Sequence, residues 1–466
     1  MISHEAHPGR PWNDGLPSTS SLRTLGDLGD DMLDGRRVLI TADIDVARRQ
    51  TSSESHFKIA RLADTVEYLL QRNATVLVLG AQGGTSVRVL EPGNTQGLEW
   101  HRKALARALP DGRAVTRFDR LDDLSAVTPA PGTVALLPNL AELSRDDDAP
   151  ANGENALGEA LLPTLLRGHF DVFVLDDFRS TVRALPSNVG LAAHKPRAVG
   201  LGLQGDLDSL ARLVARSRAL REDSRRSRVC FIGSSRPEDV TVARSLLTAD
   251  VFDRIVLGPM PSLTVYQELG YVLGAGPTAD LESLVRTHRA VVAPGAVPSF
   301  ALDHHDRLVL PTDFMVANRA GRGKARRVTP EGLGELAEDD RIMSIGPETL
   351  KAFAEETRRA GLIFHFGMMS AGQRPYVAYT EAVIRTNLES TAEVYMAGDH
   401  ILEIAHDIGL VSALRGRSTG AQTASSLLSG VQVPGLAPFR KADAGGGPGD
   451  HDRTGESDGT TPTSGR

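Results

Sequence analysis

The chain has 466 residues, of which 41% are hydrophobic and 24% are charged, as is typical of soluble globular proteins. This length exceeds one ordinary core and predicts two or three domains. The formal net charge of −7 argues against a general nucleic-acid-binding protein, which needs a basic face. No apolar run approaches about 18 residues and no signal peptide is apparent, so we expect a cytoplasmic protein without membrane contact.

The two ends of the chain differ from its middle. Residues 1–21 and 441–466 are rich in small and polar residues and carry no hydrophobic periodicity. Such segments cannot build a packed core. We therefore expect both ends to be disordered.

Between these ends, short runs rich in β-branched residues alternate with longer amphipathic segments. The first strand-like run is R-V-L-I-T, and a helical pattern over 58–71 follows it. The strand-like runs begin at Arg37, Thr75, Val134, Phe170, Val229, Arg254, Ala290, Leu308, Gly361 and Glu393. Uninterrupted apolar strands separated by helices predict parallel sheets covered on both faces, in a doubly wound α/β fold.

A basic stretch separates two such series of strands and helices. Residues 211–228 read A-R-L-V-A-R-S-R-A-L-R-E-D-S-R-R-S-R. This composition is typical of a solvated helix face and also of a helix that links two domains. We predict one domain over 22–210, a hinge helix over 211–228 and a second domain over 229–417.

The turns that follow the strands should carry the chemistry, because ligands of open α/β sheets bind at the carboxyl ends of strands. In chain order the informative segments are R-V-L-I-T-A-D-I-D-V, V-A-L-L-P-N-L, F-V-L-D-D-F-R-S-T-V-R-A-L-P-S-N-V-G, F-I-G-S-S-R-P-E-D-V, I-G-P-E-T-L, A-G-D-H, S-T-G and V-P-G-L-A. With this order and spacing, residues 22–438 resemble the phosphoglycerate kinase family. The resemblance implies two Rossmann-like domains joined by a helical hinge, and a segment over 418–440 that returns to the hinge and the first domain.

The resemblance also implies an activity. It implies a phosphotransferase that moves the γ-phosphoryl group of ATP reversibly to a carboxylate, with 3-phosphoglycerate, a glycolytic acid, as the default acceptor. The implied cofactors are Mg²⁺ and ATP or ADP, and the implied partners are a small acidic metabolite and the nucleotide, bound by a monomer. Phosphoryl transfer depends on positioning and cationic charge. A different acid, or a pseudoenzyme with a binding or regulatory role, remains an alternative.

On the substrate side, the resemblance assigns Asp43, Asp45, Lys58 and Arg183 to the acidic ligand, and gives Lys58 and Arg183 catalytic roles. Asp45 stands where the family has Asn and adds a negative charge near the expected anion. Lys58 stands where the family has Arg, so it keeps the charge but lacks the bidentate fork.

Other substrate-side cations and donors of the family are missing. Their positions are occupied by Ala81, Gly84 and Ala141. Arginines that could restore the charge are Arg48, Arg49 and Arg179. An ordinary surface arginine is the competing interpretation for each of the three.

On the nucleotide side, the resemblance assigns Arg236, Gly367, Gly398, Asp399 and His400 to the nucleotide. Arg236 replaces a lysine that follows the transferring phosphoryl group, which gives it a catalytic role. Asp399 would also orient the magnesium ion, at a helix start whose N–H groups favour anions. The alternative interpretation is that Asp399 only caps the helix.

The nucleotide side also departs from the family. G-P-M-P-S from Gly258 places two prolines in a turn that is glycine-rich in the family, which removes N–H donors. Met396 and Ala397 replace two glycines before Gly398, and a Cβ narrows the approach to the backbone. These changes predict altered contacts with adenine, ribose and phosphate.

Overall fold

The computed structural model describes residues 19–46, 56–82, 98–126, 129–143, 157–223, 225–233, 239–288, 303–318 and 324–441. Most of the two predicted disordered ends and the predicted strand at Ala290 lie outside these residues. So do Arg48, Arg49, Gly84 and Arg236.

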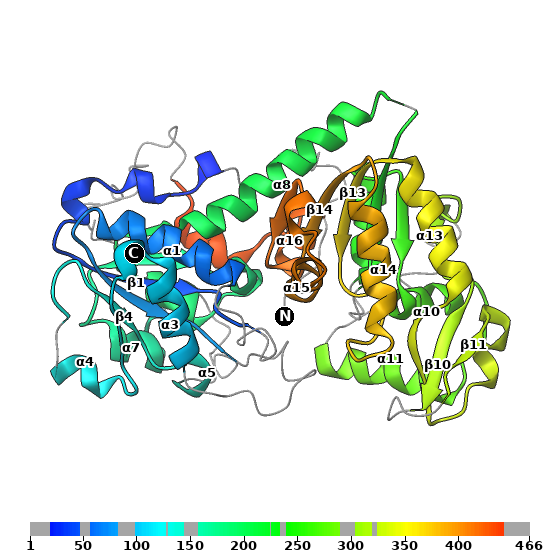
Figure 1. Ribbon diagram of the computed structural model, residues 1–466, viewed down its shortest axis with the longest axis horizontal. Helices are drawn as coiled ribbons and strands as arrows, with labels where there is room; N and C mark the ends of the chain where they lie inside the picture. The colour runs from blue at the N-terminus through cyan, green and yellow to red at the C-terminus, as the bar shows by residue number, and fades with distance from the viewer. Residues whose placement is uncertain are drawn as a thin grey trace, which may run out of the picture.

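Within the described residues, two six-stranded parallel sheets form the centres of two lobes (Figure 1). The N-terminal sheet has the order β3-β4-β2-β1-β5-β6. Its strands are β1 (Arg37–Ala42), β2 (Thr75–Leu79), β3 (Val115–Arg117), β4 (Val134–Leu136), β5 (Val172–Asp176) and β6 (Arg197–Val199). Every residue of β2 and β5 is buried, which is the pattern expected of parallel strands covered on both faces.

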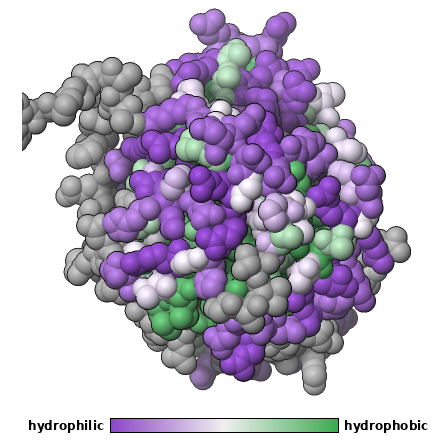
Figure 2. Space-filling model, turned by 90° about the vertical axis from the view of Figure 1, so that its left-hand side faces the viewer, coloured by the Kyte–Doolittle hydropathy of each residue, from purple (hydrophilic) through white to green (hydrophobic). Residues whose placement is uncertain are grey.

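Helices and short turns cover the N-terminal sheet. They are α1 (Phe57–Leu70), α3 (Glu99–Ala108), α4 (Asp122–Ala126), α5 (Leu140–Leu143), α7 (Leu161–Leu166) and the 3-10 turn η8 (Arg179–Val182). Figure 2 shows that the outer end of this lobe is mainly hydrophilic, with apolar residues in small separate areas. In the described part of the chain, no helix has the length and apolar character needed to cross a membrane.

The C-terminal sheet has the order β15-β14-β13-β7-β8-β9. Its strands are β7 (Ser227–Ile232), β8 (Arg254–Leu257), β9 (Leu308–Val309), β13 (Ala360–Phe366), β14 (Glu393–Ala397) and β15 (Gly416–Ser418). The helices of this lobe are α9 (Asp239–Thr248), α10 (Pro259–Glu268), α11 (Ala275–His288), α13 (Pro347–Arg359), α14 (Val377–Leu388), α15 (Asp399–Asp407) and α16 (Ala421–Leu428). The two parallel sheets confirm the predicted α/β fold class.

A smaller antiparallel sheet was not predicted from the sequence. It lies in the C-terminal lobe and has the order β11-β10-β12. Its strands are β10 (Phe314–Asn318), β11 (Arg326–Val328) and β12 (Asp340–Ile345). Exposed and half-buried residues interrupt these strands, so they lack the continuous apolar pattern of the parallel strands.

Helix α8 (Leu201–Leu220) leads from the N-terminal lobe to the C-terminal lobe (Figure 1). It begins and ends earlier than the hinge helix predicted at 211–228, and Ser227 already belongs to β7. The start of this helix was not predicted, because its first turns contain glycines and glycine is a poor helix former. Gly202 is required there because a Cβ would come within 2.8 Å of Asp176 Oδ1.

After the C-terminal sheet, the chain returns to the N-terminal lobe. The 3-10 segment η12 (Pro434–Phe439) precedes a bridge between Arg440 and Leu22. The backbone N–H of Arg23 donates to the Phe439 carbonyl at 2.6 Å. Two segments of chain, α8 and this returning segment, therefore connect the lobes.

Candidate active site

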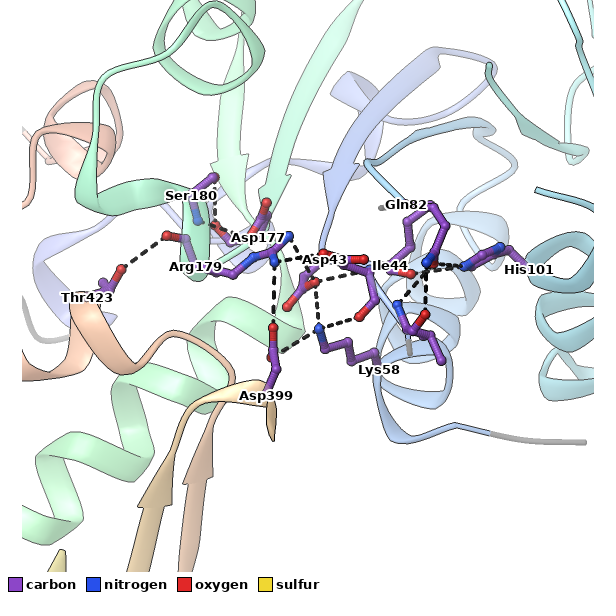
Figure 3. A network of polar contacts seen from close by, with 12 residues as sticks. Asp43, Ile44, Lys58, Gln82, His101, Asp177, Arg179, Ser180, Asp399 and Thr423 are labelled. Atoms are coloured by element: carbon purple, nitrogen blue, oxygen red, sulfur yellow. Dashed lines mark hydrogen bonds and ion pairs between the residues drawn. The ribbon is translucent and has the colours of Figure 1, made fainter. Parts of the chain in front are cut away.

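Residues of both lobes meet at the carboxyl ends of strands (Figure 3). Asp43 and Asp45 follow β1, Lys58 lies in the first turn of α1, Arg179 lies in η8 after β5, and Asp399 follows β14. These five residues are called the interlobe cluster below. The sequence resemblance predicted four of them, and the structure brings all five together.

Lys58 is the centre of the interlobe cluster. Its Nζ lies 2.9 Å from Asp43 Oδ1 and 3.0 Å from Asp399 Oδ1 and donates to the Asp45 carbonyl at 2.7 Å. The contacts with Asp43 and the Asp45 carbonyl are hydrogen bonds, and the contact with Asp399 is an ion pair. Burial opposes the charged form, but the Asp399 and Asp43 carboxylates outweigh it and raise the pKa of Lys58. Lys58 is therefore a buried, charged cation.

The position of Lys58 follows from the start of α1. The Nδ1 atom of His56, the N-cap residue, accepts a hydrogen bond from the Lys58 backbone N–H at 3.3 Å. Burial, with the Lys58 charge, lowers the pKa of His56 to about 3, so the ring is neutral and able to accept. The cap therefore fixes the direction in which α1 presents Lys58.

Arg179 is the second cation of the interlobe cluster. Its Nη1 lies 3.1 Å from Asp45 Oδ2 and 3.6 Å from Asp399 Oδ2, and its Nη2 lies 3.7 Å from Asp43 Oδ1. The side chain is 26% exposed. Among the arginines that the sequence suggested as replacements, Arg179 thus lies in the site. Its ion pair with Asp45 also offsets the extra negative charge at that position.

Asp399 lies at the start of α15 but is not its N-cap residue. Gly398, with φ of 113°, is the N-cap of α15, and Asp399 is the first residue of the helix. Its carboxylate extends to Lys58 and Arg179 of the other lobe (Figure 3). Burial raises the pKa of the Asp399 carboxyl, the Lys58 and Arg179 charges oppose the shift, and Asp43 adds to it.

A hydrogen-bonded layer supports the loop after β1. Gln82 Nε2 donates to the Val46 carbonyl at 2.8 Å, and the Val46 N–H donates to Gln82 Oε1 at 3.0 Å. His101 Nε2 lies 2.8 Å from Gln82 Oε1 and 3.0 Å from the Ile44 carbonyl. Asn139 exchanges two hydrogen bonds with the Gln82 backbone. No sequence motif predicted this layer, although Gln82 lies in the turn after β2.

The remaining substrate-side candidate, Arg183, lies at the end of η8. Its side chain is exposed, and its carbonyl accepts a hydrogen bond from Asn188 Nδ2 at 3.0 Å. The direct contacts with Asp399 come from Arg179, four residues earlier in the chain. Arg183 therefore stays a predicted substrate ligand.

Glycines lie close together at the carboxyl ends of β7, β8 and β13. A Cβ on Gly233 would lie 2.6 Å from the Gly367 carbonyl, and a Cβ on Gly258 would lie 2.9 Å from Gly233 Cα. Gly258 is the N-cap of α10, so Pro259 occupies the first helical position, where a missing N–H is tolerated. The prolines therefore fit the helix start, although they remove donors as predicted.

The other nucleotide-side candidates lie at the start of α15. His400 follows Asp399 and is half-buried. A Cβ on Gly398 would lie 3.1 Å from the Cβ of Ala421, the first residue of α16. The N-termini of α15 and α16 thus adjoin beside the interlobe cluster. Arg236 lies outside the described residues, and its role stays a prediction.

The protein has two α/β lobes, and a buried charged site lies where their strand ends meet. It is therefore a bilobal protein with its candidate active site between the lobes. The family model described as phosphoglycerate kinase matches residues 28–431. The chain therefore belongs to the phosphoglycerate kinase family, as the sequence resemblance predicted.

Curated relatives named phosphoglycerate kinase match almost the whole chain. The relative from Roseiflexus castenholzii is 27% identical over 414 residues, which cover 88% of this chain and 97% of the relative. The relative from Rubrobacter xylanophilus is 28% identical over 413 residues, which cover 87% and 95%.

Solved structures show the same fold. The crystal structure of phosphoglycerate kinase from Pyrococcus horikoshii has a TM-score of 0.70 at 20% identity, and the match covers 90% of this chain and 98% of that one. The phosphoglycerate kinase structure from Coxiella burnetii has a TM-score of 0.57 at 19% identity, with the same coverage.

Proposed function

We propose that this chain catalyses reversible transfer of the γ-phosphoryl group of ATP to a carboxylate, with 3-phosphoglycerate as the default acceptor. Family membership and relatives named as kinases support phosphoglycerate kinase-like phosphotransfer over the pseudoenzyme alternative. The observation that carries the proposal is Asp399, which lies at the N-terminus of α15 and faces Lys58 of the other lobe at 3.0 Å. A cytoplasmic monomer remains the expectation from the sequence.

The residues present fit a magnesium ion that arrives with the nucleotide. Mg²⁺ is usually held by one or two carboxylates together with substrate phosphates. Asp399 supplies a carboxylate at a helix N-terminus. The described residues contain no group of three or more His, Cys, Asp or Glu side chains that could hold a metal. When bound, the ion would neutralise phosphate charge.

The chain's own contribution to the transfer is position and charge. An oxygen of the acceptor carboxylate forms a bond to the γ-phosphorus while the bond from that phosphorus to the leaving ADP oxygen breaks. Lys58 supplies a buried positive charge where the lobes meet, and negative charge on the transferred group is stabilised by such a charge in a low-dielectric site. Arg183 and Arg236 are the predicted further cations around the acid and the moving phosphoryl group.

The nucleotide is proposed to lie against the strand ends of the C-terminal lobe. Gly233, Gly258 and Gly367 carry no side chains at that edge, and neighbouring backbone leaves no room for a Cβ on Gly233 or Gly258. The N-termini of α10 and α15 open at the same edge and favour phosphate groups. This arrangement supports a phosphate-bearing ligand next to Asp399.

Calorimetric titration with Mg-ATP and Mg-ADP tests the proposal. Asp399→Ala should weaken nucleotide binding at least tenfold, or about 1.4 kcal/mol. Asp407→Ala, at the exposed end of the same helix, is the matched control and should bind as the wild type does. If the wild type does not bind Mg-ATP or Mg-ADP at millimolar concentration, the proposal is wrong. A coupled assay with 3-phosphoglycerate then tests the acid, and nucleotide binding without turnover would favour another acid or a pseudoenzyme.

A further inference from the structure

A histidine lies near the end of β13, a strand that is otherwise apolar. All residues of this strand are buried, and His365 is the one with an ionisable side chain. We propose that His365 is a positioning residue for the nucleotide: it fixes the peptide group between Gly367 and Met368, whose N–H then donates a hydrogen bond to the bound nucleotide. This inference rests on the proposed nucleotide site at the strand ends of the C-terminal lobe.

Both nitrogen atoms of the His365 ring have hydrogen-bond partners. Nε2 lies 3.1 Å from the Gly367 carbonyl oxygen, and Nδ1 lies 3.4 Å from Asn387 Nδ2. The Thr357 hydroxyl donates to Asn387 Oδ1 at 2.7 Å, so the amide nitrogen of Asn387 faces the ring as a donor. Because Nδ1 must then accept, Nε2 carries the proton and donates to the Gly367 carbonyl.

This chain of hydrogen bonds is buried. His365 and Asn387 are fully buried, and Thr357 is 2% exposed. Burial lowers the pKa of His365 to about 4, so the ring is neutral near neutral pH and has one donor and one acceptor. The ring also packs against Phe231 of β7, with 5.5 Å between the ring centroids. These contacts hold the ring in one orientation.

The bond from His365 sets the direction of one peptide group at the proposed nucleotide edge. The C=O and N–H groups of a trans peptide point in opposite directions. The Gly367 carbonyl faces His365, so the Met368 N–H points away from the buried ring. Within the described residues, this N–H has no protein acceptor. It lies next to Gly233, because a Cβ on Gly233 would lie 2.6 Å from the Gly367 carbonyl oxygen.

Helix α14 holds the other side of the same turn. The Met369 N–H donates to Thr380 Oγ1 at 3.0 Å. Thr380 and Asn387 lie about two helical turns apart, so their buried side chains are on one face of α14. The backbone is therefore fixed on both sides of Met368, by His365 before it and by Thr380 after it.

Calorimetric titration with Mg-ATP tests the positioning role. His365→Phe keeps an aromatic ring but removes both hydrogen bonds, and it should weaken binding about five- to tenfold. His365→Gln is the conservative variant, because its Nε2 amide can donate where the histidine Nε2 does, and it should restore most of the affinity. Wild-type affinity of His365→Phe would overturn the proposal, as would equally weak binding by the two variants.

Ser217→Ala separates positioning from general stability. It removes a buried hydrogen bond from the α8 hydroxyl to the Val251 carbonyl, far from the turn in the chain. Urea unfolding should show a loss of stability, while the affinity for Mg-ATP should stay at the wild-type value. If Ser217→Ala weakens Mg-ATP binding as much as His365→Phe does, the positioning role is wrong.

Met368→Pro tests the donor itself. Proline has no N–H, so binding of Mg-ATP should weaken about as much as in His365→Phe. Met368→Leu keeps the N–H and should bind as the wild type does. Wild-type affinity of Met368→Pro would contradict the assignment of this donor.

Nitrogen NMR of the histidine rings tests the hydrogen-bond chain even if His365→Phe folds poorly. The wild type should show an Nε2–H tautomer that is missing from His365→Gln, and an Nδ1–H tautomer would overturn the proposal. If the wild type binds Mg-ATP and His365→Phe binds it equally well, only the positioning role is wrong. If the wild type does not bind Mg-ATP, the nucleotide site and the positioning role are both wrong.

Discussion

Arg61 of α1 and Asp206 of α8 form an ion pair beneath the site, with 2.9 Å between Nη2 and Oδ2. Asp206 is 2% exposed, and its Oδ1 has no hydrogen-bond partner in the described part of the chain. The pair lines a cavity of about 20 Å³ that Asp43 and Lys58 also line. The Arg61–Asp206 ion pair therefore links α1, which carries Lys58, with α8, which connects the two lobes.

Asp206 predicts a pH dependence of stability. Burial raises the pKa of its carboxyl to about 6 although Arg61 opposes the shift, so between about pH 4 and 6 the folded state binds more protons than the unfolded state. The free energy of unfolding should then fall as pH rises through this window, by up to about 1.4 kcal/mol per pH unit. Urea unfolding at several pH values should show this fall in the wild type relative to Asp206→Asn.

The control for this pH series lies in the same helix. Asp208→Asn changes a half-buried carboxyl two residues further along α8. Its unfolding free energy should run parallel to that of the wild type across the window. Equal slopes for the wild type and Asp206→Asn would contradict the raised pKa of Asp206.

Lys58→Ala should lower both activity and stability. The change removes a cation at the reaction centre, so kcat/KM should fall by about 100-fold or more. It also leaves the Asp43 and Asp399 carboxylates without their nearest cation, which should cost about 3–5 kcal/mol of unfolding free energy. Lys351→Ala, at a 73% exposed side chain on α13, should match the wild type in both measurements.

Gln82→Ala tests the layer behind the site. The change leaves the buried Val46 N–H and carbonyl without their side-chain partner, at about 1–3 kcal/mol of unfolding free energy. Because the Asp43–Val46 loop loses its support, KM for the acid should rise more than kcat falls in steady-state assays. Gln71→Ala, which removes an exposed hydrogen bond to Glu67, should change neither constant.

Gly233→Ala tests the glycine contacts at the nucleotide edge. Its Cβ would lie 2.6 Å from the Gly367 carbonyl, so the backbone must shift, at about 1–3 kcal/mol of unfolding free energy. Mg-ATP binding should weaken as well, as calorimetry would show. Gly168→Ala meets no atom within 4 Å and should retain wild-type stability and binding, whereas a similar loss in both variants would argue against a local cause.

The long apolar strands were predictable because burial on both faces requires continuous apolar residues. The predicted runs correspond to β1, β2, β4, β5, β7, β8, β9, β13 and β14. The three-residue strands β3 (V-T-R) and β6 (R-A-V) carry polar or charged residues and show no apolar run, whereas β4, of the same length, is wholly apolar. Residue type, more than strand length, therefore limited the prediction of the fold.

The charged site was predictable only in part. Asp43, Lys58 and Asp399 follow strands or begin helices at positions that the family pattern marks. In the sequence, Asp45 differs from the family's Asn, and Arg179 is only a candidate for replacing a missing cation. Nothing in the sequence links the two residues, because 134 residues separate them in the chain. Only the folded sheet shows that the two departures offset each other's charge.

The return of the chain to its starting lobe has a consequence for synthesis. Phe439 is fully buried, and its ring lies 6.2 Å from that of Phe173 in β5. Ser21 and Arg23 also bond to the backbone of the last described residues. The lobe that leaves the ribosome first therefore cannot complete its core until the chain has been synthesised as far as Phe439.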